Sequence, residues 1–216
     1  NTDVMAGSLR VGPAVGSGTL TVRSGALITP GLAGANGTSD VGALVLEGNS
    51  RSEFRLGVAT DKFNATGTLT PPVSGQTHTV NLAGAATSGG TITLIDYTGA
   101  ALTTDEFSRF VLGTVPSGAA TYQLVNNTPN TSVDLLVTLE NQVWKGSTNG
   151  NWDQATTNWA LGSAPLVPVL FDAGRPSLFG DNPTTSAVTV AAGIAPTQTT
   201  FTNDTTDYTL TGNGIQ

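Results

Sequence analysis

The sequence predicts an all-β protein, and three observations support this prediction. Only 11% of the 216 residues are charged, well below the roughly 25% of an ordinary globular domain. Residues that drive helix formation are scarce, whereas Gly contributes 27 residues, and Gly, Thr, Ser and Asn all disfavour helices. Short segments that alternate apolar with polar residues recur between glycines, which is the period of half-buried strands.

The first four expected strands lie in the N-terminal half of the chain. Segment 18–25 alternates Leu and Val with Thr and Arg, and segment 42–48 carries two Leu residues at alternate positions. Segment 52–57 alternates Phe and Leu with Glu and Arg. Segment 91–97 places Ile and Leu between Thr residues. All four segments are close to the usual strand length of about 5 to 6 residues.

Four further strands are expected in the C-terminal half. Segments 122–125 and 187–190 are short and contain Val, and segment 132–139 is a long expected strand with Val and Leu residues. Segment 207–212 alternates Tyr and Leu with Thr. Strands that recur after roughly 8 to 12 residues, with Gly or Asn between them, are typical of a sandwich, a barrel or a β-solenoid.

The turns favour a solenoid among these architectures. Asn36-Gly37 and Asn149-Gly150 are the only clear two-residue hairpin signals between the expected strands, so tight antiparallel hairpins are rare. In a solenoid each turn of the chain buries its inward side chains against the turns above and below, which leaves the outer face free for Thr, Ser and Asn. We therefore expect a parallel β-helix, with a β-sandwich for residues 1–140 as the alternative.

A change of composition near Glu140 divides the chain. Residues 1–140 are expected to form a β-solenoid module. Residues 141–216 form a second block, in which a Trp-containing and proline-punctuated loop region returns to strands at Ala187. All three Trp residues of the chain lie in this second block.

The charge balance excludes nucleic acid as a main partner. There are 8 Lys and Arg residues against 15 Asp and Glu, which gives a net charge of -7 and a pI near 4.4. Such a surface lacks the cations that a phosphate backbone requires. No apolar run approaches the roughly 18 residues of a spanning helix, so no membrane insertion is expected. A surface of hydroxyls and amides in place of charge favours an extracellular or cell-surface location.

Catalytic chemistry is not expected from the titratable residues. The single histidine, His78, alternates with Thr in segment 76–80 and is expected at an exposed strand position, with no role as a base. One histidine and no cysteine exclude standard zinc sites. Adjacent residues of a strand point to opposite faces, so Asp105 and Glu106 should not form an acid–base pair. Asp204 and Asp207 lie in a Thr-rich segment that we expect to be a solvated turn, since a calcium site needs more oxygen ligands. No catalytic residue, metal or cofactor is therefore predicted.

The three Trp residues, Trp144, Trp152 and Trp159, admit two interpretations. An exposed row of indole rings would form an aromatic platform for sugar rings. Buried rings would instead act as large plugs at the junction between the two modules. The plug interpretation is favoured. Five Asn-x-Thr/Ser sequences are candidate glycosylation sites, and they lie at Asn36, Asn64, Asn126, Asn130 and Asn203.

Four passages resemble the autotransporter-associated β-strand repeats of long, exported bacterial surface proteins. The matching passages are Gly-Ser-Gly-Thr-Leu-Thr-Val at 16–22 within segment 16–31, the pair 44–56 and 61–69, segment 90–99, and the Trp block 144–159 with Phe171-Asp172 and Tyr208-Thr-Leu-Thr-Gly-Asn-Gly-Ile at 208–215. The likeness covers nearly the whole chain, and its Trp block is the most specific part. It implies a right-handed parallel β-helix, export, and a structural or adhesive role without chemistry of its own.

The order of the passages suggests how copies of the chain associate. The last passage, 208–215, reads as though it continues into the first, 7–12. We therefore expect the last turn of one copy to stack on the first turn of the next, either in a covalent tandem repeat or in a head-to-tail polymer. Such a contact between two different surfaces does not close on itself, so it generates a filament. The predicted function is a non-enzymatic structural protein of an extracellular fibre, filament or surface layer, with itself as partner. The alternatives are a glycan-binding adhesin module and a β-helical polysaccharide-degrading enzyme.

Overall fold

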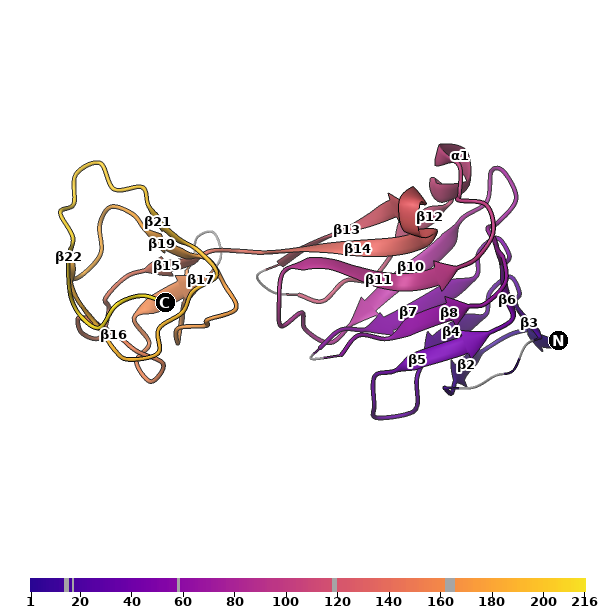
Figure 1. Ribbon diagram of the computed structural model, residues 1–216, viewed down its shortest axis with the longest axis horizontal. Coiled ribbons are helices and arrows are strands. Elements are labelled where there is room, and N and C mark those ends of the chain that lie inside the picture. Colours follow the sequence, from indigo (N-terminus) through magenta and orange to yellow (C-terminus); the bar gives the residue numbers. More distant parts are fainter. Residues whose placement is uncertain (14–15, 17, 58, 118–119, 162–165) are drawn as a thin grey trace. The chain divides into compact units, whose positions relative to one another are not determined.

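The computed structural model describes residues 1–13, 16, 18–57, 59–117, 120–161 and 166–216. The protein is nearly all β, which confirms the predicted fold class, and most of its strand pairs are parallel (Figure 1). The chain divides into two compact units. Unit 1 consists of Asn1–Ser117 and Tyr122–Val137, and unit 2 consists of Gly118–Thr121 and Thr138–Gln216.

Three sheets make up unit 1. The first sheet has the order β1 (Thr2–Val4), β3 (Thr19–Val22), β6 (Ala43–Leu46) and β9 (Leu69–Thr70). The second has the order β12 (Phe110–Leu112), β10 (His78–Ala83), β7 (Arg51–Arg55), β4 (Leu27–Pro30) and β2 (Ser8–Val11). The third has the order β13 (Ala120–Asn127), β14 (Ser132–Leu139), β11 (Gly90–Tyr97), β8 (Lys62–Ala65) and β5 (Thr38–Val41).

The chain visits these three sheets in rotation. Strands β3, β4 and β5 lie in the first, second and third sheets, and β6, β7 and β8 repeat that order, as do β9, β10 and β11. Thr19 pairs with Ala43 in the first sheet and Thr38 with Lys62 in the third, both in parallel and both at an offset of 24 residues. This pairing differs from the antiparallel sheets that define a β-sandwich. An antiparallel pair in unit 1 joins β11 to β14.

The core of unit 1 consists of apolar side chains that recur at matching positions of successive strands. Leu20 of β3 is in register with Leu44 of β6, and Leu44 with Leu69 of β9; all three side chains are buried. Phe54 and Phe63 meet edge to face with ring centroids 5.9 Å apart. Such rows arise because alternate residues of a strand face one side, so parallel neighbours in register bring inward side chains together.

A short helix replaces the strand expected around Asp105 and Glu106. Helix α1 (Thr104–Phe107) begins with a capping box in which the Thr103 side chain accepts from the Glu106 N–H and the Glu106 carboxylate accepts from the Thr103 N–H. Asp105 pairs with Arg109. The expectation that Asp105 and Glu106 lie on a strand was therefore wrong. In helix α1 the two carboxylates have different partners, Arg109 for Asp105 and Thr103 for Glu106. A 3-10 turn, η1 (Thr128–Asn130), connects β13 to β14.

Unit 2 contains two sheets. One has the order β18 (Val167–Val169), β17 (Trp159–Leu161), β15 (Gln142–Trp144), β19 (Ser177–Phe179) and β21 (Thr199–Phe201). The other has the order β16 (Asn151–Trp152), β20 (Ala187–Val190) and β22 (Thr209–Gly212). The pairs β15–β19, β19–β21, β16–β20 and β20–β22 are parallel, whereas β17 pairs antiparallel with β15 and β18.

A strand occurs in each of the eight segments where the sequence predicted one. The expected segment 18–25 contains β3, for example, and the expected segment 207–212 contains β22. Segments with weaker alternation, such as 2–4 and 62–65, also form strands. The division between the units falls after Val137, close to the boundary placed at residue 141.

Candidate functional surfaces

His78 is a buried core residue, so the prediction of an exposed position was wrong. Its side chain is fully buried on β10, and its ring packs edge to face against Phe110 with ring centroids 5.9 Å apart. The Nδ1 atom lies 2.8 Å from Ser50 Oγ, and the Nε2 atom lies 3.0 Å from Ser52 Oγ. Burial lowers the pKa of His78 from 6.5 to about 3.

The hydrogen bonds around His78 hold a neutral ring. The Ser50 hydroxyl donates to the Glu47 carbonyl oxygen at 2.5 Å, so Ser50 Oγ is left to accept from the Nδ1–H group. The Ser52 hydroxyl then donates to Nε2. Both ring nitrogens are thereby satisfied with one ring proton. Because the His78 ring is fully buried, it does not contact solvent. His78, Ser50 and Ser52 therefore form a structural hydrogen-bond network.

The three Trp residues form the centre of unit 2. Trp144, Trp152 and Trp159 are each at most 1% exposed, and they pack with Phe171 and Phe179 into one apolar cluster. Ring centroids of Trp152 lie 5.2 Å from those of Trp159 and Phe179. A sugar stacks only on an exposed ring face, so these rings do not form the platform considered above. Their burial fits the plug interpretation, but the cluster is the core of unit 2 itself and not a junction plug.

Hydrogen bonds to the indoles differ among the three residues. Trp144 Nε1 donates to the carbonyl oxygen of Thr185 at 2.8 Å. The Nε1 atoms of Trp152 and Trp159 are buried without a partner among the described residues. The indole rings of both residues pack against other aromatic rings, whose faces are weak acceptors. The cluster therefore contributes mainly apolar burial.

Asn158 fixes the loop that carries the Trp residues. Its side chain is buried, and its Oδ1 atom accepts from the N–H groups of Thr148 and Asn149. Its Nδ2 group donates to Asn149 Oδ1 at 2.8 Å and to the Asn151 carbonyl oxygen at 2.7 Å. The side chain of Asn158, which precedes Trp159, thus holds the backbone of this loop.

Four of the five candidate glycosylation sites have their side-chain amides engaged. Asn36 donates to the carbonyl oxygens of Arg55 and Ala59, Asn64 to Asp40, Asn126 to Leu102, and Asn203 to Thr206. Asn130 is exposed on η1, but the hydroxyl of its sequence motif belongs to Ser132, which is buried and donates to Asp134 at 2.7 Å. In the folded chain these interactions compete with modification at all five asparagines.

The acidic segment 204–207 wraps around a carboxylate that the sequence did not single out. Asp181 accepts from the backbone N–H groups of Asp204, Thr205 and Thr206 at 2.9–3.1 Å and from the Thr205 hydroxyl at 2.9 Å. These bonds, that from the Thr205 N–H foremost, lower the pKa of Asp181 to about 2. The carboxylates of Asp204 and Asp207 are exposed, as expected of a solvated turn. Within the described ranges, no group of three or more His, Cys, Asp or Glu residues is placed to hold a metal ion.

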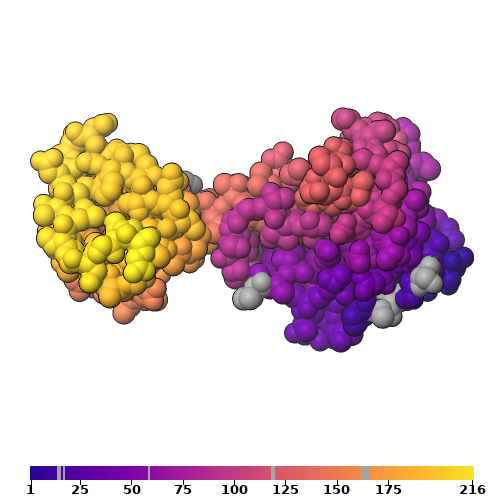
Figure 2. Space-filling model, viewed as in Figure 1, coloured from indigo at the N-terminus to yellow at the C-terminus, as the bar shows by residue number. Residues whose placement is uncertain are grey.

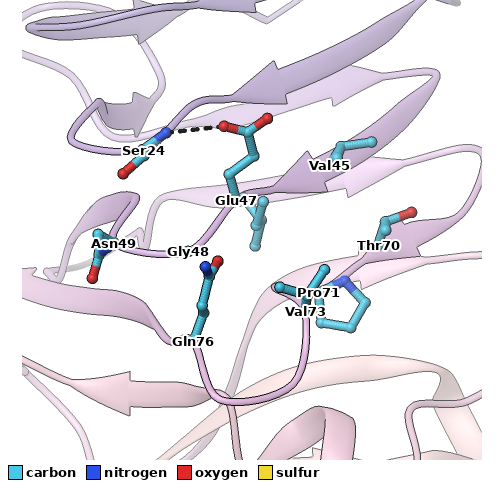
Figure 3. A pocket seen from close by; sticks show the side chains of 10 residues that line it. Ser24, Val45, Glu47, Gly48, Asn49, Thr70, Pro71, Val73 and Gln76 are labelled. Carbon is cyan, nitrogen blue, oxygen red and sulfur yellow. Dashed lines mark hydrogen bonds between the residues drawn. The ribbon is translucent and has the colours of Figure 1, made fainter.

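A groove of about 410 Å³ lies on unit 1 between the end of β6 and the segment 70–76 (Figure 3). Its carboxylate, Glu47, points toward Ser24 and accepts from the Ser24 N–H at 3.1 Å and from the Arg23 side chain. The bond from Arg23 lowers the pKa of Glu47. Gln76 covers Gly48 so closely that a Cβ atom at position 48 would lie 1.9 Å from its side-chain oxygen. The groove therefore presents apolar side chains, among them Val45, Pro71 and Val73, beside amides and hydroxyls, while its carboxylate already has partners.

Unit 2 presents an apolar surface beside its last two strands. β21 and β22 are the edge strands of their sheets, and all four residues of β22 are exposed. Phe201, Leu210 and Ile215 are 46%, 36% and 39% exposed. A groove of about 330 Å³ runs along this edge between Val190 and Ile215. The last residues of the chain, bright yellow in Figure 2, lie on the visible surface of unit 2.

Comparisons with protein-family models, with curated proteins and with solved structures find no match to this chain. Among the described residues, no helix has the length and apolar character needed to cross a membrane.

Proposed function

We propose that this chain is a non-enzymatic structural module of an extracellular fibre, filament or surface layer, which assembles head to tail by stacking of strand edges. In this proposal each unit is a right-handed parallel β-helix related to the autotransporter-associated β-strand repeats. The rotation of the chain through three sheets, with a repeated offset of 24 residues, supports the helical path. The right hand follows from the strong preference of parallel crossover connections.

The single observation that carries the proposal is the open apolar edge of unit 2. Among the described residues, β21 and β22 each have a strand neighbour on one side only, and Phe201, Leu210 and Ile215 are exposed beside them. Natural proteins cover or charge such edges because they template further strand pairing. A parallel strand that continued the ladder would satisfy the backbone groups and cover the three side chains.

The proposed occupant of this edge is a second copy of the chain. In unit 1, β1 is an edge strand of the first sheet and β2 is an edge strand of the second. Each pairs in parallel with its neighbour, β1 with β3 and β2 with β4. Arg10, exposed on β2, and Asp207, exposed just before β22, have charges of opposite sign, and Asp3 of β1 is already paired with Arg23. A contact between two different edges is heterologous and generates a filament.

The state of the carboxylates supports a non-enzymatic role. A glycoside-cleaving acid needs a raised pKa. The pKa values of Glu47, Glu106 and Asp181 are instead lowered, in each case chiefly by a hydrogen bond: from the Arg23 side chain, the Thr103 N–H and the Thr205 N–H respectively. These groups are held as structural carboxylates. Glycan binding through the Trp residues lacks support because their rings are buried.

Sedimentation velocity over a wide range of protein concentrations tests the proposal. The wild-type chain is expected to form larger species as concentration rises, and Leu210→Lys should reduce this association by placing a charge in the contact. Val73→Lys is the matched control, because Val73 is 65% exposed and lies outside the strand edges. Melting temperatures of both variants verify that they fold. A wild-type chain that stays monomeric throughout would overturn the proposal, as would equal effects of the two substitutions in folded protein.

A further inference from the structure

We infer that Asn213 is a site of spontaneous deamidation, which the fold leaves open while it protects the two other Asn-Gly pairs of the chain. In this reaction the backbone nitrogen of Gly214 attacks Cγ of Asn213, the Cγ–Nδ2 bond breaks, and ammonia leaves a cyclic succinimide. Water then opens the ring at either carbonyl and gives aspartate or isoaspartate at position 213. Water is the only co-reactant, and no oxidation or reduction takes place. A following glycine favours the attack because it has no Cβ atom to hinder the approach.

Little holds the Asn213 side chain in place. Both Asn213 and Gly214 are exposed, and a Cβ atom at position 214 would meet nothing within 4 Å. The Asn213 side chain donates to the Val190 carbonyl oxygen at 3.3 Å, which is a long hydrogen bond. The described residues provide no acceptor for the Gly214 N–H group. Rotation of the side chain toward Gly214 therefore breaks only one weak interaction.

In the pair Asn36-Gly37, both reacting groups are held. The Gly37 N–H, which contains the attacking nitrogen, donates at 2.9 Å to Oδ1 of the buried Asp61. The leaving amide of Asn36 donates to the carbonyl oxygens of Arg55, at 3.2 Å, and of Ala59. Formation of a succinimide here would break all three hydrogen bonds and disturb a buried carboxylate.

In the pair Asn149-Gly150, the electrophilic carbonyl is held. Asn149 Oδ1 accepts from the Asn151 N–H at 2.9 Å and from the buried Asn158 side chain at 2.8 Å. The Asn149 N–H donates to Asn158 Oδ1 at 3.0 Å. The Cγ atom of Asn149 cannot turn toward Gly150 without opening this network, which also supports the loop of Trp152 and Trp159.

Deamidation at position 213 would change the surface beside β22. It would exchange a donor to the Val190 carbonyl oxygen for a carboxylate, and the isoaspartate form would lengthen the backbone after Gly212. The new charge would lie in the groove that includes Leu210 and Ile215. Its effect on assembly depends on the function proposed above, whereas the deamidation site itself does not.

Peptide mapping by mass spectrometry tests the inference on dilute, folded protein incubated at neutral to mildly alkaline pH. Conversion at Asn213 is expected to be faster than at Asn36 and Asn149 by at least about tenfold, because reaction at those two positions requires local unfolding. In concentrated denaturant, the rates at the three positions should converge to within a few-fold. Equal rates at the three positions in the folded chain would overturn the inference, and so would protection of Asn213 that is lost only in denaturant.

Gly214→Ala provides the matched variant. The added Cβ atom has free space in the fold, so the variant should keep the wild-type melting temperature while its deamidation slows. Gly37→Ala is unsuitable for this purpose because Gly37 lies in the network around Asp61. An undiminished rate in folded Gly214→Ala protein would contradict the proposed attack by the backbone nitrogen.

Discussion

The Nδ1 atom of His78 lies 2.8 Å from the hydroxyl oxygen of Ser50 in the core of unit 1, where no water reaches the ring. A second serine, Ser52, bonds the other ring nitrogen. The core thus contains a histidine whose neutral form is fully hydrogen-bonded and whose charged form lacks a counter-charge in the contacts that it makes. Burial of His78 should therefore make the stability of the fold depend on pH.

Acid should weaken the fold through His78. The pKa of His78 is about 3 in the folded state and 6.5 in the unfolded state, so below pH 6.5 the unfolded chain binds the proton more readily. The free energy of unfolding should then fall by about 1.4 kcal/mol per pH unit as pH drops from 6.5 toward 3. Denaturant unfolding at pH 6.5 and 4.5 measures this loss, and His78→Gln, which does not titrate, should lack it. Identical pH profiles of the two proteins would contradict the prediction.

The hydrogen bond of Trp144 should distinguish it from Trp152. Both Trp→Phe substitutions remove similar apolar area from the core of unit 2. Only Trp144→Phe leaves the Thr185 carbonyl oxygen without its donor, since Trp152 Nε1 has no partner among the described residues. Trp144→Phe should therefore cost about 1–3 kcal/mol more free energy of unfolding than Trp152→Phe. Denaturant unfolding monitored in unit 2 provides the comparison, and equal costs would show that the hydrogen bond contributes nothing measurable.

Asp181 should order the segment 204–206. In Asp181→Asn, one side-chain oxygen is replaced by a donor, so the amides of Asp204, Thr205 and Thr206 should exchange with deuterium faster. Because the pKa of Asp181 is lowered to about 2, this contribution to stability is present above the usual aspartate pKa and is lost as pH falls through about 2. Asp207→Asn, which changes an exposed carboxylate of the same segment, should leave the exchange rates unchanged. Equal exchange in both variants would argue against the role of Asp181.

Gly31 and Gly34 should respond differently to substitution by alanine. Both have positive φ angles, of 75° and 79°, so each substitution carries a similar backbone cost of about 1 kcal/mol. A Cβ atom at position 31 would also lie 2.8 Å from the Arg55 guanidinium and 3.0 Å from the buried Asp61 carboxylate, whereas position 34 is open. Gly31→Ala should therefore lower the free energy of unfolding by a further 1–3 kcal/mol or so, through loss of the Arg55–Asp61 ion pair geometry. Similar unfolding midpoints for the two variants would refute this account.

Short-range signals in the sequence located the eight expected strands but did not determine which face of each strand is buried. The alternation in segment 76–80 located β10, yet it did not decide which of the two alternating sets of side chains faces inward, so His78 was wrongly expected at an exposed position. The spacing of Thr103 and Glu106 is a capping-box signal for α1, but a helix of four residues has no apolar periodicity to accompany it. The Thr103 and Glu106 pair is the signal in the sequence that indicates this helix.

Long-range contacts left no signal in the sequence. Asp181 and Thr205 are 24 residues apart, and nothing in either segment indicates that they bond. The sequence shows the Trp residues as large apolar groups, but it does not show that they form the core of unit 2. That core depends on the pairing of β16 with β20 and of β15 with β19. The exposed edge with Leu210 likewise depends on which strands have neighbours.

Composition and local alternation are enough to predict short strands, because a glycine-rich and hydroxyl-rich composition opposes helices and the alternation of each strand is a property of its own backbone. Which face of each strand is buried, which strands pair in parallel and which polar side chains are enclosed depend on how the folded chain packs. Those outcomes depend on contacts between residues 20 to 40 positions apart, such as Trp144 with Phe179, and the local pattern of a segment contains no information about its distant neighbour.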